Sequence, residues 1–152
     1  MAGTAAGTAW LNVTIAVASL AILGRRDEAG VFARNIESLL DRGIVCANWV
    51  ASTYQLAGIA CGCEREWDAS ESYFRKALEL SATMPLRPEE AIARTAYADM
   101  LRHRDRAGDR ERARVLCGEA ESMAAKLGLA LDRKSTRLNS SHVQPSRMPS
   151  SA

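Results

Sequence analysis

The stretch WDASESYFRKALEL, from Trp67 to Leu80, carries the clearest structural pattern in this sequence of 152 residues. Large and small residues alternate at three- and four-residue steps on one face of a helix, while charged residues cover the other face. The patterned face consists of Trp67, Ser70, Phe74, Ala77, Leu78 and Ser81. Small residues between large ones let a neighbouring helix approach closely, so the stretch predicts helix-on-helix stacking.

The composition agrees with a helical protein, because 47% of the residues are hydrophobic and only 5% are aromatic. We therefore expect an all-α fold. The net charge of +2 is uneven: residues 1–131 carry 16 basic and 17 acidic side chains, and residues 132–152 carry four basic and one acidic. The larger part, at about −1, has no bulk attraction for nucleic acid.

The first 23 residues contain no charged side chain, which raises the alternative of a signal peptide or a membrane span. A signal peptide would need a basic start, and a span would need a more apolar composition than this mixture of Ala, Gly and Thr. We expect a buried first helix from about Thr4 or Thr8 to Leu23, ended by Gly24.

Apolar periodicity predicts five further helices, with Asp27, Asn48 and Asp109 as N-caps. They are Glu28 to about Leu40, Ala47 or Asn48 to Cys61, the patterned stretch itself, Pro88 to about Arg104, and the segment from Asp109 to Gly128. Six helices would form about three stacked antiparallel hairpins. Gly58 inside a helix costs about 1 kcal/mol relative to Ala, so we expect the next helix to approach closely there.

An internal repeat supports this architecture. The segments GRRDEA, EREWDAS and GDRERA place Ala29, Ser70 and Ala113 at equivalent points, 41 and 43 residues apart. A single hairpin cannot bury its apolar face, and three stacked hairpins are near the minimum for a stable array.

Eight residues of this sequence resemble one unit of the tetratricopeptide family. They are Tyr54, Ala57, Gly58, Cys61, Trp67, Ser70, Phe74 and Ala77. Ser70 stands where the family usually has alanine, and Cys61 where it usually has an aromatic residue. The repeat is also longer than the family's usual period of about 34 residues. The resemblance implies a tetratricopeptide-like α-solenoid over residues 1–131.

The sequence from Gly24 to Leu129 is similar to the C-terminal helical region of large bacterial regulators. In these, a cyclase or DNA-binding head domain is joined to an ATPase module and then to helical repeats. The resemblance implies a non-catalytic fragment for protein–protein interaction or signal relay. The alternatives are the regulatory part of an adenylate or guanylate cyclase–ATPase enzyme, and the effector-sensing part of a LuxR-type or maltose-regulator-like activator. The chain has no G-x-x-x-x-G-K-[ST] phosphate loop.

Residues 132–152 form a different segment, which contains RKSTRLNSSHVQPSRMPSSA. It is rich in serine, has two prolines and lacks an apolar period, so we expect it to be disordered. It also resembles translated read-through of a sequencing-library adapter, which would make this end of the chain artificial.

No catalytic, metal or cofactor site is predicted. The cysteines at 46, 61, 63 and 117 are expected to be reduced thiols of a cytoplasmic protein. Together with His103 they could suggest a zinc site, but the C-x-C spacing of Cys61 and Cys63 has no second close pair, which argues against one. A catalytic cysteine needs a base, and neither His103 nor His142 has an orienting partner in sequence.

An arginine-rich segment from Arg102 to Arg114 invites a nucleic-acid interpretation. Asp105, Asp109 and Glu111 are interleaved with the arginines, and no aromatic residue is available to stack on bases. We therefore expect a solvated turn with local ion pairs, and no contact with nucleic acid or membrane.

The expected partner is a protein or peptide, or the head domain of the same parent chain. In stacked hairpins the first helix of each pair tends to line the concave surface. Polar residues off the core stripes of these helices are the predicted partner-binding set, namely Ser52, Gln55, Arg94 and Asp99.

Overall fold

The computed structural model describes residues 4–45, 51–83 and 87–128. Over these ranges the chain is helical and contains no strand, so the predicted all-α class is confirmed for the described part. The helices are α1 (Thr4–Ile22), α2 (Arg26–Gly30), α3 (Ala33–Asp41), α4 (Thr53–Cys63), α5 (Trp67–Thr83), α6 (Arg87–Arg104) and α7 (Asp109–Lys126).

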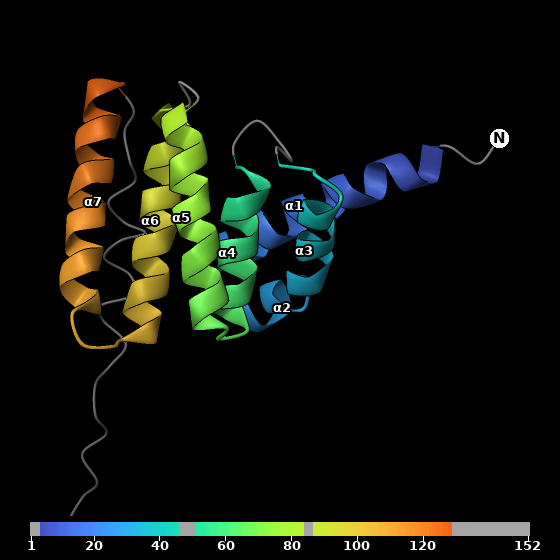
Figure 1. The fold of residues 1–152 in the computed structure, drawn as a ribbon, viewed down its shortest axis with the longest axis horizontal. Coiled ribbons are helices and arrows are strands. Elements are labelled where there is room, and N and C mark those ends of the chain that lie inside the picture. The colour runs from blue at the N-terminus through green and yellow to red at the C-terminus, as the bar shows by residue number, and fades with distance from the viewer. Residues whose placement is uncertain (1–3, 46–50, 84–86, 129–152) are drawn as a thin grey trace, which may run out of the picture.

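Helices α4 to α7 lie side by side, and each runs opposite to the one before it (Figure 1). Tight turns at residues 64–66 and 105–108 join them into two antiparallel hairpins, α4–α5 and α6–α7. The hairpins stack through α5 and α6, and α4 also contacts α6. The two C-terminal hairpins therefore form as expected.

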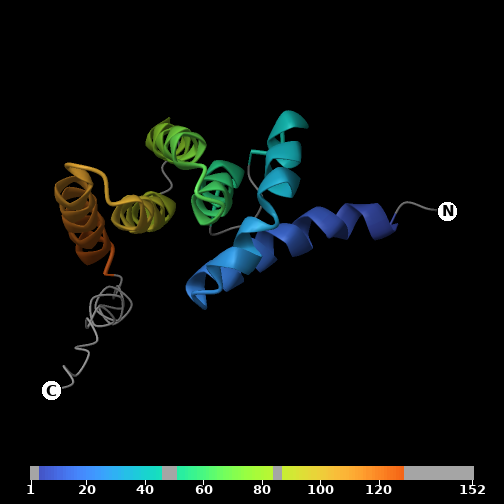
Figure 2. The same cartoon turned by 90° about the horizontal axis from the view of Figure 1, so that it is seen from below.

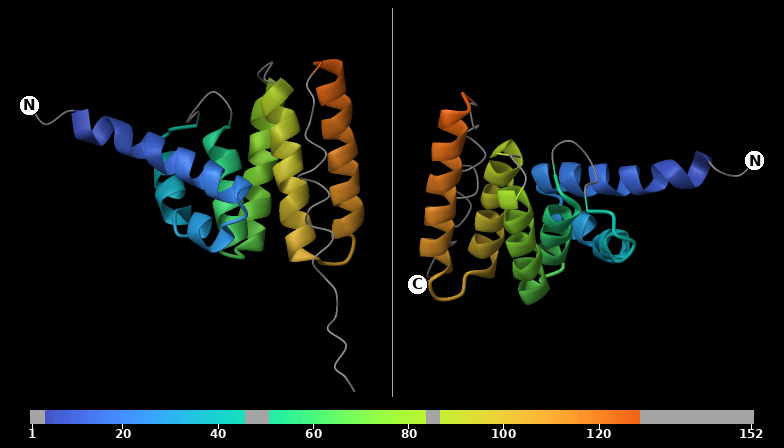
Figure 3. Two further views of the ribbon diagram at one scale, coloured as in Figure 1. Left: turned by 180° about the vertical axis from the view of Figure 1, so that it is seen from behind. Right: turned by 45° about the horizontal axis from the view of Figure 1, so that its top comes forward.

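The first expected hairpin does not form. Helix α1 crosses α2 and α4 instead of running antiparallel to one long partner, as Figure 2 shows. Its N-terminal half extends away from the other helices in both views of Figure 3. The prediction of about three stacked antiparallel pairs is thus wrong for the first pair.

The expected helix from Glu28 to Leu40 is broken into α2 and α3. Gly30, which ends α2, is a poor helix former and is buried against the start of the α4–α5 turn. A Cβ atom on Gly30 would lie only 2.4 Å from the Glu64 carboxylate. The chain bends at this buried glycine, where α2 ends.

Two predicted N-caps are wrong, and a third lies outside the described residues. Helix α4 begins at Thr53, and its cap is Ser52, whose hydroxyl accepts a hydrogen bond from the Gln55 backbone N–H at 3.2 Å; Asn48 lies outside the described residues. Helix α2 has no side-chain cap from Asp27. Asp109 is the first residue of α7, and its carboxylate accepts hydrogen bonds from the preceding turn.

The core between α4 and α5 depends on small residues. The Ser70 hydroxyl donates a 2.6 Å hydrogen bond to the Gly58 carbonyl, and the buried Phe74 ring packs directly on the Gly58 Cα. A Cβ atom at Gly58 would lie 2.9 Å from that ring. The predicted close approach of the next helix at this glycine is confirmed.

Beyond this contact the core continues through α6 and α7. The rings of Phe74 and Tyr97 stack with their centroids 5.3 Å apart. The expected small contact residues Ala77, Ala113 and Ala120 are buried, as are the repeat-equivalent Ala29 and Ser70. The helix phases predicted for α5 and α7 are therefore correct.

Two helical glycines offer a matched test of this packing. Gly58→Ala should lower the free energy of unfolding by about 1–2 kcal/mol, because overpacking against Phe74 outweighs the gain in helix propensity. Gly118→Ala should raise it by about 0.5–1 kcal/mol, because nothing lies within 4 Å of a Cβ atom there. Urea unfolding followed by circular dichroism measures both, and a stabilised Gly58→Ala variant would contradict the close packing.

Candidate functional site

Two of the predicted partner-binding residues are not on the surface. Ser52 is 7% exposed and Gln55 is 3% exposed, so the prediction that they lie off the core is wrong. The reason is tertiary: α1, α2, α3 and α5 all contact α4, and the Ser52 hydroxyl is occupied by its role as the helix cap. These buried side chains are therefore not available to a partner in this structure.

The other two predicted residues lie on different sides of α6. Arg94 faces α7, where it is held by Glu90 at 2.6 Å and by Glu119. Asp99 is about half exposed and accepts a hydrogen bond from Arg102 at 2.5 Å. Only Asp99 therefore lies on the side of α6 that is free of neighbouring helices.

This free side, here called the α6 open face, was only partly anticipated. It is formed by Ile92, Thr95, Asp99, Arg102 and His103, where the first four follow one another at three- and four-residue steps and His103 lies four residues after Asp99. Ile92 was expected to point inward but is 36% exposed, because alanines and larger side chains at other positions of α6 fill the contacts with α4, α5 and α7.

The end of α6 and the beginning of α2 meet at the end of α4. Partial burial lowers the pKa of His103, and the nearby charge of Arg26 lowers it further. Arg26 of α2 donates a 3.4 Å hydrogen bond to the Gly62 carbonyl, and Met100 of α6 packs against the same glycine. The open face also borders α7, where the Arg102 guanidinium donates a hydrogen bond to Cys117 Sγ at 3.4 Å.

A network of ion pairs joins α5, α6 and α7 at the other side of α6. Arg104, which is 4% exposed, bonds to Asp109 at 2.7 Å and to Glu71. Arg112 and Tyr97 also contact the Glu71 carboxylate, both at 2.9 Å. The predicted local ion pairs of the arginine-rich segment are confirmed, but the expectation of a solvated turn is wrong for Arg104 and for Asp109, which is 3% exposed.

The network fixes the charge of its carboxylates. Burial raises the pKa of Glu71, but hydrogen bonds from Arg104, Arg112 and Tyr97 outweigh burial and lower it from 4.5 to about 2. The hydrogen bond from Arg104 likewise lowers the pKa of Asp109. Since every charged group has a partner, the network is suited to holding helices together rather than to acid–base chemistry.

Removing the central cation should be costly. Arg104→Met should lower the free energy of unfolding by about 3–5 kcal/mol at pH 7, because it leaves the buried Asp109 carboxylate without its ion-pair partner and removes one of the arginines bound to Glu71. Arg114→Met is the matched control: it breaks the exposed pair with Glu111 and should cost less than about 1 kcal/mol. Urea unfolding measures both values.

The same network predicts a pH dependence. The folded-state pKa of Glu71 lies below its unfolded value, so this contribution is present above about pH 4.5 and is lost as the pH falls toward 2. The stability difference between the parent and Arg104→Met should therefore shrink over that interval. A difference that stays constant from pH 7 to about pH 3 would contradict the assignment.

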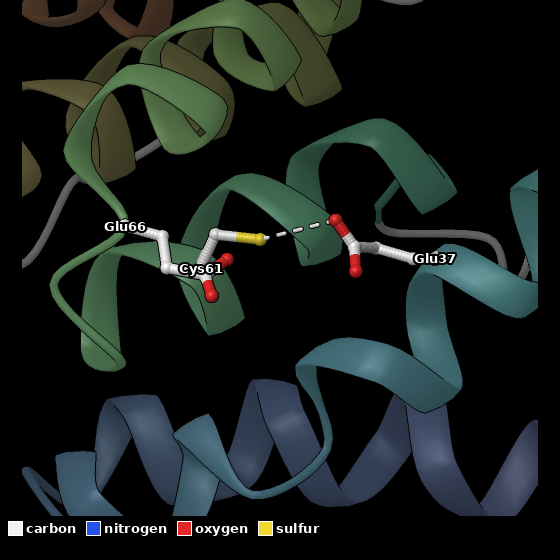
Figure 4. Close-up of side chains that lie close together, drawn as sticks. All are labelled: Glu37, Cys61 and Glu66. Carbon is white, nitrogen blue, oxygen red and sulfur yellow. Dashed lines mark hydrogen bonds between the residues drawn. The ribbon is translucent and has the colours of Figure 1, made fainter.

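A second polar cluster brings together three helices near Cys61. Figure 4 shows the Cys61 thiol directed at Glu37, with 3.8 Å between Sγ and Oε1, and the Glu66 side chain folded back toward the same residue. Ligand atoms of Glu37, Cys61 and Glu66 all lie within 4.8 Å of one another. The Tyr73 hydroxyl donates a 3.0 Å hydrogen bond to Glu37.

From the sequence, Cys46, Cys63, Cys117 and His103 were the residues weighed with Cys61 for a zinc site, and their spacing argued against one. The structure instead brings two carboxylates to Cys61. Cys46 lies outside the described residues. Glu37 is 24 positions upstream of Cys61, and only the packing of α3 against α4 unites them, so no local spacing signals this cluster.

The cluster is not suited to nucleophilic catalysis in its present form. Burial raises the pKa of the Cys61 thiol to about 12, and the charges of Glu37 and Glu66 add to the effect. The thiol is therefore protonated at neutral pH, whereas a nucleophilic cysteine must be a thiolate. Burial also raises the pKa of Cys63.

A scan against protein-family models finds no match, and searches of curated proteins and of solved structures find none either. The tetratricopeptide-like relationship, the parent regulator and the adapter-like origin of residues 132–152 thus stay predictions. Within the described ranges, no helix combines the length and the apolar character needed to cross a membrane.

Proposed function

We propose that this chain is a non-catalytic, tetratricopeptide-like module of a larger cytoplasmic bacterial regulator. In this proposal it binds a protein or peptide segment, either a separate partner or the head domain of its own parent chain. The observation that carries the proposal is the α6 open face. It is a row of exposed and half-buried side chains on a helix whose other sides contact α4, α5 and α7, and among the described residues outside α6 only Cys117 of α7 bonds to it, through Arg102.

The side chains of this face suit a peptide partner. Ile92 offers exposed apolar area, and Thr95 and His103 offer polar groups close to it. Asp99 and Arg102 form an exposed ion pair that could exchange partners at little cost, because exposed pairs contribute less than about 1 kcal/mol. Apolar area combined with replaceable polar contacts is typical of non-obligate protein interfaces.

The rigidity of the surrounding helices also supports the proposal. The Arg104 network and the Phe74–Tyr97 stack hold α6 in place from behind, so the open face is preorganised. The same surface would serve a cyclase-linked regulator or a transcription activator, because either parent would use it to contact a protein segment. No described feature favours one head domain over the other.

A peptide-display selection tests the proposal. Random linear peptides are selected on the immobilised 152-residue chain, and enriched peptides are synthesised and titrated by fluorescence anisotropy. Ile92→Asp should weaken their binding at least tenfold by placing a charge on the apolar centre of the open face. Val115→Asp is the matched control, since Val115 is exposed on α7 beside Arg94, away from the open face, and this change should leave binding unaltered.

Two outcomes would overturn the proposal. One is a selection that enriches no peptide above the level found on an unrelated helical protein. The other is enriched peptides that bind Ile92→Asp as tightly as the parent, which would place their site elsewhere. Circular dichroism melts confirm that both variants remain folded.

A further inference from the structure

The Glu37–Cys61–Glu66 cluster differs electrostatically from the rest of the protein. Outside the first turn of α6, an arginine pairs with each of the other carboxylates that are buried or half-buried. These carboxylates belong to Glu71, Asp99 and Asp109. Among the described residues, neither Glu37 nor Glu66 has any ion pair. Two carboxylates thus converge on one fully buried sulfur without a compensating positive charge.

We propose that Cys61 Sγ and one carboxylate oxygen each from Glu37 and Glu66 bind a divalent cation of the zinc class. The three donors come from α3, from α4 and from the turn before α5, so the ion would be held between three elements. On binding, the Cys61 S–H bond breaks, its proton passes to solvent, and a sulfur–metal bond forms. This site is independent of the peptide-binding face on α6.

The geometry is compatible with such an ion. Tetrahedral zinc ligands at about 2.0–2.3 Å from the metal are about 3.3–3.8 Å from one another. The Cys61 Sγ to Glu37 Oε1 distance is already 3.8 Å, and the whole set lies within 4.8 Å. Rotation of the two glutamate side chains can close the remaining difference of about 1 Å without moving a helix.

The donor set selects the class of ion. A thiolate favours zinc, cobalt or cadmium over magnesium and calcium, which take oxygen ligands. Three protein ligands leave one tetrahedral position for water. The Tyr73 hydroxyl, which donates to Glu37, would orient that carboxylate as a supporting residue does around many metal ligands.

An ion can reach the site from solvent. Cys61 is fully buried, but Glu66 is exposed at the α4–α5 turn and Glu37 is half-buried. Glu66 is also tied to Cys61 through the backbone, because its N–H donates a 2.9 Å hydrogen bond to the Cys61 carbonyl. The exposed carboxylate can therefore capture the ion first and deliver it to the buried sulfur.

Cobalt titration of the full chain tests the site. A variant with Cys46→Ser, Cys63→Ser and Cys117→Ser keeps Cys61 as the sole thiol. Adding Co²⁺ at neutral pH should produce a thiolate-to-cobalt charge-transfer band that saturates at one equivalent. About one proton should be released per ion, and Zn²⁺ should remove the band by displacement.

Further variants separate this site from binding elsewhere. Cys61→Ser in the otherwise unchanged chain should abolish the band, and Glu37→Gln and Glu66→Gln should each weaken Co²⁺ binding at least tenfold. Glu64→Gln is the matched control, because it removes an equal charge from a neighbouring exposed position outside the cluster. The proposal is overturned if the folded sole-thiol variant gives no charge-transfer band at millimolar Co²⁺. It is also overturned if both glutamine variants at positions 37 and 66 bind as tightly as the parent.

Discussion

The contact of α4 with α5 at Gly58 is the constraint on which the other contacts depend. The missing side chain lets Phe74 lie directly on the α4 backbone, and the Ser70 hydroxyl fixes the register through the Gly58 carbonyl. Only in that position does Phe74 present its ring to Tyr97 of α6. The orientation of the second hairpin therefore depends on the missing side chain at Gly58 in the first hairpin. Small residues decide in this way how closely two helices can approach.

Sequence periodicity was sufficient to predict which residues are buried where the position on a single helix decides burial. The phases of α5 and α7 could be predicted because Ala77, Ala113 and Ala120 repeat at helical spacing. It was insufficient where a distant segment decides burial. Gln55 is buried on a helix that contacts five other helices, and nothing in the sequence around Gln55 indicates these contacts. The prediction that Ser52 contacts a partner has a related weakness, because a polar residue near the start of a helix can either cap that helix or face a partner.

The polar clusters were the least predictable features, because their members are far apart in sequence. Arg104 and Glu71 are separated by 33 positions, and Cys61 and Glu37 by 24. The two clusters nevertheless follow opposite rules. One matches every carboxylate to an arginine and thereby fastens helices, whereas the other gathers carboxylates around a sulfur and leaves negative charge unbalanced. The contrast is what distinguishes a structural network from a candidate binding site.

The Arg104 network also affects the way in which the protein unfolds. In an array of helical pairs each unit normally contacts only its neighbours, so the terminal helix can fray without disturbing the rest. Here Arg104 of α6 links Glu71 of α5 to Asp109 of α7, and Arg112 of α7 reaches Glu71 directly. Opening α7 would break the bond of Arg112 to Glu71, which lies two helices away, and would separate Arg104 from Asp109. The coupling extends beyond nearest neighbours, so the last three helices should open as one cooperative unit instead of peeling off singly.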